Sequence, residues 1–180
     1  MFKAIGGFVV GVLLIGVIAW NSAGALMFRE VPSPFGVEET AARIQANIKA
    51  VGKGWKLSGL RDPAGAVARA GGNVLPVLLV EACSTEYSKP LLKDDTTRIL
   101  SILMPCSITV YKKQDGKVYI GLMNAGLMGK LFGSKVAAVM DQVAADQEKF
   151  IDFDPSKPAP PLIKIRPGGG SAEGGDIEGC

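Results

Sequence analysis

An uncharged, apolar stretch of 25 residues, from residue 4 to residue 28, constrains the fold of this chain more than any other feature. About 20 apolar residues in a helix cover the ~30 Å hydrocarbon core of a bilayer, so the stretch is long enough to span a membrane. Lys3 and the α-amino group precede it, whereas the charges of Arg29 and Glu30 cancel after it. The positive-inside rule therefore places the N-terminus in the cytoplasm. We expect residues 1–28 to be a single-pass anchor in the inner (cytoplasmic) membrane, with the remaining chain periplasmic or extracytoplasmic.

A cleaved signal peptide is the alternative interpretation of the same segment. Ala23-Gly24-Ala25 fits the small-residue pattern of a cleavage site, and Lys3 supplies a short basic region before the apolar run. The apolar run is longer than the 7 to 15 residues typical of a signal peptide, which favours the uncleaved anchor. Both interpretations export the rest of the chain.

The remaining composition limits the chemistry that the exported part can perform. The chain has 180 residues, which corresponds to about one domain. It contains no histidine, which excludes Ser-His and Cys-His catalysis and every site that needs a histidine ligand. The net charge of +3 is too small and too dispersed to indicate nucleic-acid binding. We therefore expect no nucleic-acid partner and no cofactor.

Hydrophobic periodicity and turn residues predict the elements of the domain. Apolar residues at helical spacing predict a helix over residues 37–51, and residues 55–60 are typical of a strand. Asp62 and Pro63 form a helix start, with Asp at the N-cap and Pro at the first helical position. Residues 74–82 predict a strand with Pro76 near its beginning, and residues 85–94 a weak helix broken at Pro90.

The clearest local pattern is a β-hairpin. Two alternating runs, 107–113 and 117–123, flank Asp115-Gly116, and we expect a tight turn with positive φ at both of these residues. A second long amphipathic helix begins near Ser134. Two main helices and four or five strands, the first near residues 26–31, predict a small α+β domain with an antiparallel sheet and its helices on one face.

The composition changes again at residue 154. Residues 154–180 contain five prolines and six glycines and show no periodicity. Such a segment is expected to be extended, and to be ordered only where a partner holds it. The predicted organisation is thus an anchor over 1–28, an α+β domain over 29–153 and a Pro/Gly-rich tail over 154–180.

Three stretches of the predicted domain resemble domain-of-unknown-function family 302. The tripeptide Glu81-Ala82-Cys83 is similar to the start of the family's G-A-C-N-P signature, and residues 102–111 (ILMPCSITVY) resemble its L-L-P-C-N-V-V-V-Y signature. Residues 34–40 (PFGVEET) are similar to the family's S-x-E-E-T helix start. The resemblance covers about residues 27–153 and implies a small α+β fold that readily forms dimers, with no assigned reaction. Ser84-Thr85 and Ser107 depart from the signatures, where the family has asparagine and proline after the first cysteine and asparagine after the second.

The cysteines are the candidate ligand or redox residues. Cys83 and Cys106 each lie at the boundary of a predicted strand. They are interpreted as small buried side chains, as a disulfide worth roughly 3 kcal/mol in an oxidising compartment, or as a dithiol for soft-metal or sulfur chemistry. Cys180 ends the tail and is a third candidate, on a flexible arm. No group of ligands suggests a metal site, and no residue is assigned a catalytic role.

These observations predict a membrane-anchored periplasmic accessory or ligand-binding subunit of a membrane protein complex, respiratory or photosynthetic in kind. Its expected partners are integral membrane subunits and the bilayer, with a homodimer through the domain as a further arrangement. The alternative is a periplasmic protein that handles thiols, sulfur or a soft metal through Cys83 and Cys106.

Overall fold

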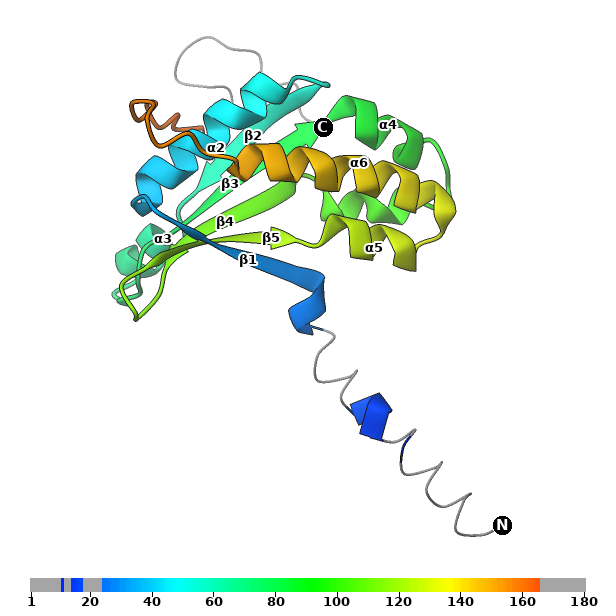
Figure 1. The fold of residues 1–180 in the computed structure, drawn as a ribbon, viewed down its shortest axis with the longest axis horizontal. Coiled ribbons are helices and arrows are strands. Elements are labelled where there is room, and N and C mark those ends of the chain that lie inside the picture. The colour runs from blue at the N-terminus through cyan, green and yellow to red at the C-terminus, as the bar shows by residue number, and fades with distance from the viewer. Residues whose placement is uncertain (1–10, 12–13, 18–23, 166–180) are drawn as a thin grey trace.

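The domain is built on one antiparallel sheet of five strands with helices packed on one side. In the computed structural model, residues 11, 14–17 and 24–165 are described. The strands are β1 (Phe28–Ser33), β2 (Trp55–Arg61), β3 (Val77–Ser84), β4 (Cys106–Lys112) and β5 (Val118–Met123), in the sheet order β1-β5-β4-β3-β2. The helices are α2 (Val37–Val51), α3 (Pro63–Arg69), α4 (Thr85–Leu92), α5 (Ala125–Leu131), α6 (Ser134–Ile151) and the 3-10 helix η1 (Arg98–Leu103). The predicted α+β class and the antiparallel sheet are confirmed (Figure 1).

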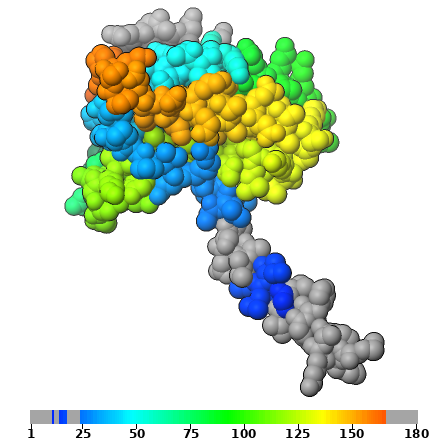
Figure 2. All heavy atoms as spheres, viewed as in Figure 1, coloured from blue at the N-terminus to red at the C-terminus, as the bar shows by residue number. Residues whose placement is uncertain are grey.

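The two longest helices, α2 and α6, cover the inner face of the sheet. Ile44 and Ile48 of α2 and Phe150 of α6 are almost fully buried. They belong to the same core as Val80, Ile108 and Ile120 of the central strands. Figure 2 shows α2 in light blue and cyan and α6 in yellow and orange, lying side by side as a continuous layer. The apolar residues predicted at helical spacing in both helices therefore lie on the faces that pack against the core.

The hairpin is present, but its predicted turn geometry is wrong in one respect. Gly116 has a positive φ of 80°, whereas Asp115 does not lie in the left-handed region. Gly116 N–H donates to Lys113 C=O, and Lys113 N–H donates to Lys117 C=O. This longer loop needs only one left-handed residue, because the turn closes on Lys113 and Gly116 takes the position that follows the turn.

Two other local expectations need correction. Pro90 lies inside α4 and does not break it, because the ring removes a single backbone donor and Lys93 N–H still donates to Lys89 C=O. Helix α5 was not expected, because its sequence AGLMGKL contains two glycines and little periodicity.

The first part of the tail is ordered by the domain itself, which corrects the expectation that a partner must hold it. Residues 154–165 lie beside α2 and β2, and the Ile165 carbonyl accepts a hydrogen bond from Leu60 N–H. The buried Gln45 side chain donates to the Ile163 carbonyl and accepts from Ile163 N–H. Arg43 donates to the carbonyls of Asp154 and Lys157. The end of the tail, including Cys180, lies outside the described residues.

No helix among the described residues is long and apolar enough to cross a membrane. Most of the predicted anchor lies outside these residues. Residues 24–27 form a helical turn that leads directly into β1. The predicted N-terminal strand is therefore displaced to Phe28–Ser33.

Candidate functional site

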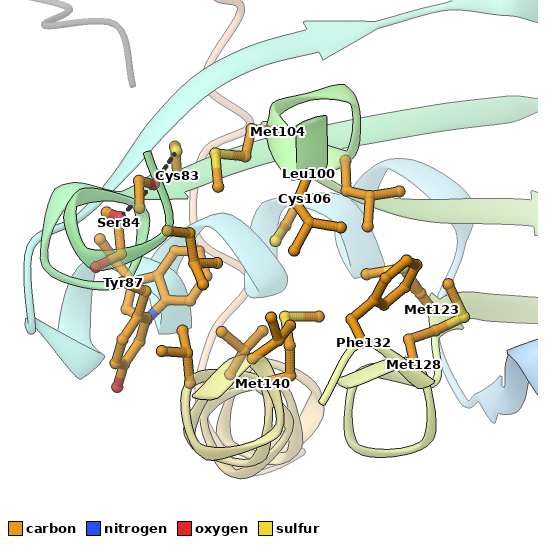
Figure 3. Close-up of a pocket in the computed structure, with 17 residues that line it drawn as sticks. Cys83, Ser84, Tyr87, Leu100, Met104, Cys106, Met123, Met128, Phe132 and Met140 are labelled. Atoms are coloured by element: carbon orange, nitrogen blue, oxygen red, sulfur yellow. Dashed lines mark hydrogen bonds between the residues drawn. The ribbon is translucent and has the colours of Figure 1, made fainter. Parts of the chain in front are cut away.

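A small cavity lies at one end of the sheet. Strands β1, β2 and β4 begin at this end, and β3 and β5 finish there, as the pairs Phe28–Met123, Trp55–Ser84 and Ala82–Cys106 show. Helices α4, α5, α6 and η1 close the space beyond the strand ends (Figure 3). The volume of the cavity is about 40 Å³. Small-molecule sites commonly measure ~300–1,000 Å³, so the cavity suits a ligand of only a few atoms.

Sulfur atoms are concentrated in the wall of this cavity. Met104, Met123, Met128 and Met140 line it, together with Cys83 and Cys106. The chain has six methionines, so two thirds of them are gathered here. The remaining lining is mainly Leu, Val and aromatic side chains from the helices. The cavity is therefore apolar and polarisable, with few groups that would hold a water molecule.

Cys106 is a free thiol at the start of β4. Its side chain points to the helix-covered face of the sheet, as do Ile108 and Val110 two and four positions further along the strand. Burial raises the pKa of the Cys106 thiol to about 11, so the sulfur is protonated at neutral pH. The Cys106 sulfur has no hydrogen-bond partner among the described residues. The thiol is thus neutral and directed into an apolar space.

Cys83 occupies a different environment from Cys106, although their strands are neighbours. Cys106 pairs with Ala82, and because side chains alternate along a strand, Cys83 leaves the opposite face of the sheet. Cys83 is disulfide-bonded while Cys106 is free, so the two are not bonded to each other. The Cys83 sulfur also contacts the Ser88 hydroxyl at 3.4 Å. Both residues of the predicted pair line the cavity, but their side chains leave opposite faces of the sheet and only Cys106 is a free thiol.

A buried carboxylate beside the cavity was missed by the sequence analysis. Asp146 of α6 is fully buried and accepts hydrogen bonds from Trp55 Nε1 at 3.1 Å and Tyr87 Oη at 2.7 Å. Lys53 and Lys149 donate to its other oxygen at 3.2 and 2.9 Å. The available signal was an acidic residue on the apolar stripe of α6, three positions after Val143 and four before Phe150.

The charges of this cluster are set by its hydrogen bonds. Burial raises the pKa of Asp146, but the four donors lower it by more, and the net result is a pKa of about 2. Burial and the hydrogen bond to Asp146 together raise the pKa of Tyr87 to about 12. Trp55 and Tyr87 also line the cavity, and their rings pack edge to face at 5.7 Å. The ionised Asp146 therefore fixes two aromatic walls of the cavity in place.

The comparison with known families supports the resemblance read from the sequence. The family model described as "Domain of unknown function DUF302" matches residues 29–153. The chain belongs to the DUF302 family. The matched range coincides with the predicted domain. The stretches that resemble the family signatures, residues 81–83 and 102–111, lie at the end of β3 and from the end of η1 through most of β4.

A solved DUF302 structure shares the fold. The crystal structure of an uncharacterized conserved DUF302 protein from Bacillus stearothermophilus superposes with a TM-score of 0.61 at 16% sequence identity. The match covers 69% of this chain and 95% of that chain. No curated protein matches the sequence. The residues outside the shared fold are thus additions to a DUF302 domain.

Proposed function

We propose that this DUF302 protein is a membrane-tethered accessory subunit whose periplasmic domain docks onto an integral membrane protein of a respiratory or photosynthetic complex. The observation that carries the proposal is a surface hollow of about 850 Å³ at the end of the sheet where the N-terminal segment enters. Gly24 and Ala25 of that segment line the hollow, with Phe28 at the start of β1 and Ile102 of η1. Its floor is the outer face of the sheet, including Thr109 and Gly121.

The exposure of the apolar side chains around this hollow supports docking. Phe28 is 67% exposed and Ile102 is 82% exposed. Large apolar groups gathered on a surface mark interaction sites, because their burial against a partner is favourable. A partner that reaches the hollow lies beside the predicted anchor, and a membrane-embedded subunit meets that requirement. The bonded state of Cys83 fits an oxidising compartment such as the periplasm.

Photo-crosslinking in native membranes tests this proposal. A photoreactive amino acid at Ile102 should form a crosslink to an integral membrane protein, and the same probe at Gln114, in the hairpin loop at the opposite end of β4, should not. Purification in mild detergent should recover the crosslinked protein with the complex and its electron-transfer activity. Crosslinks to lipid alone, to a second copy of this chain, or equally from both positions would contradict the proposal.

A second candidate function is the handling of a thiol, sulfur or soft-metal ligand. The observation that favours it is the free Cys106 thiol among four methionines in one cavity. Because Cys83 is disulfide-bonded and Cys106 is free, Cys106 is the thiol to which this chemistry is assigned. Mass spectrometry of the natively purified protein should then show persulfide or metal on Cys106, whereas a plain thiol on every molecule would speak against it.

A further inference from the structure

We propose that the cavity is a binding site for one monovalent soft metal ion, Cu(I) in chemical class, held by the Cys106 thiolate and by methionine thioethers. The inference deepens the second candidate function and does not depend on the docking proposal. The methionines of the cavity then have a role besides filling space.

The sulfur atoms of the cavity come from separate elements of the fold. Cys106 comes from β4 and Met140 from α6, and Figure 3 shows these two side chains directed into the cavity from opposite sides. Met104 enters from the η1–β4 connection. Thiolate and thioether are the soft ligands that select Cu(I), whereas Mg²⁺ and Ca²⁺ require oxygen ligands. Sulfur ligands contributed by three separate elements therefore converge on one space.

The size of the cavity limits the ligand that it can hold. A volume of about 40 Å³ admits a single ion or a molecule of a few atoms and excludes a haem or a nucleotide. A water molecule needs two to four polar partners, and this wall supplies mainly methionine, leucine, valine and aromatic carbon. A naked ion with soft sulfur ligands has no such requirement, since the sulfurs replace its hydration shell.

The charges in the cavity balance for a monovalent ion. Binding replaces the proton on the Cys106 sulfur by the metal, so that Cys–SH and Cu⁺ give Cys–S–Cu and a proton released to solvent, without oxidation or reduction. The product is neutral, because one thiolate charge cancels one metal charge and the thioethers are uncharged. An isolated charge in an apolar interior is costly, so a divalent ion with one thiolate would be strongly disfavoured. The single free thiol of the described domain thus favours a monovalent ion.

Apolar packing is the competing explanation for the methionines, since methionine commonly fills irregular core gaps. It predicts that replacing one methionine by leucine changes packing only, with no effect on metal affinity. The metal site predicts that methionines of the cavity and methionines elsewhere behave differently. Met27, which precedes β1 and does not line the cavity, provides the matched control.

The test is an anaerobic titration of the full-length chain in detergent with Cu(I), in competition with a chromophoric Cu(I) chelator. Cys83→Ser with Cys180→Ser is used as the background, because it leaves Cys106 as the single cysteine of the chain. We expect one equivalent of Cu(I), X-ray absorption with sulfur neighbours only, and release of one proton. Cys106→Ala should weaken binding by about 100-fold or more, since even the loss of outer-shell contacts at metal sites costs ~10–100-fold.

The methionine variants separate coordination from packing. Met140→Leu conserves volume and keeps the fold, and should weaken Cu(I) binding by about 10-fold, whereas Met27→Leu should leave it unchanged. Unaltered affinity in Cys106→Ala, equal effects of the two leucine variants, or no stoichiometric binding by the background chain would overturn the proposal. Photo-crosslinking from Ile102 requires no metal. A negative copper titration therefore does not change the result expected from the docking test.

Discussion

The Asp146 cluster makes a quantitative prediction about stability. A pKa of about 2 in the folded protein, against an ordinary value of 3.8, corresponds to about 2 kcal/mol of stabilisation by the ionised carboxylate. In Asp146→Asn one oxygen is kept and one becomes an amide donor, which faces either two ammonium groups or the Trp55 and Tyr87 donors. The orientation of lower free energy places the amide NH2 group beside Lys53 and Lys149, because these lysines are half-exposed and their ammonium groups can move into water. We expect a loss of about 2 kcal/mol in the free energy of unfolding.

The sign of the pH dependence follows from the direction of the shift. Because the folded-state pKa is depressed, the stabilisation is fully present above pH ~4 and is lost as the pH falls towards about 2. Asp146→Asn lacks this titration, so the stability difference between the wild type and the variant should shrink over that range. Asp146→Leu should cost more at neutral pH, about 4 kcal/mol, because it leaves the buried donors of Trp55 and Tyr87 without an acceptor.

Urea denaturation of the full-length protein in mild detergent, at several pH values, measures these differences. Asp141→Asn is the matched control, since Asp141 lies on the exposed face of the same helix and its change should cost less than ~0.5 kcal/mol. The reasoning is refuted if Asp146→Asn destabilises the protein no more than Asp141→Asn does. It is also refuted if the stability difference from the wild type stays constant between pH 5 and about 2.

Three further substitutions test separate parts of the fold. Gly116→Val should lower the free energy of unfolding by ~1 kcal/mol or more, because a β-branched residue fits a φ of 80° poorly, and an unchanged melting temperature would contradict this. Gln45→Ala removes both hydrogen bonds to Ile163 and should cost about 2 kcal/mol and expose residues 154–165 to limited proteolysis. Gly129→Ala places a methyl group 2.5 Å from Met140 Cβ and should cost ~1–3 kcal/mol, measured by urea unfolding; wild-type stability would show that α5 shifts freely.

The elements with strong local patterns were predictable from the sequence. Helix α2 follows a one-sided apolar periodicity and ends at Gly52, and both its bounds match the expected range. Asp62 caps α3 as expected, since its side chain accepts from Gly65 N–H. The hairpin position follows from the alternation around Asp115-Gly116. In each case a pattern within one short segment determines the element, so no distant contact is needed to identify it.

The elements that depend on distant contacts were not predictable in this way. Helix α5 contains two glycines, which disfavour a helix in isolation, but Gly129 allows close packing against Met140 of α6. Its local signal, Asn124 accepting from Leu127 N–H at the N-cap, was present but weak. The order of residues 154–165 likewise depends on Gln45, more than 100 positions earlier in the chain. Tertiary packing therefore overrides local composition at both places.

The candidate site shows the same division between local and distant information. Strand boundaries place Cys83 and Cys106 near one end of the sheet, but only the register shows that Cys106 pairs with Ala82, so that the two sulfurs leave opposite faces. The methionines are scattered over 37 positions, from Met104 to Met140, and no spacing rule joins them. They meet because η1, β5, α5 and α6 all converge where the sheet ends. A sequence pattern for this site therefore cannot be local. It consists of a cysteine at the start of β4 and one methionine at each of η1, β5, α5 and α6.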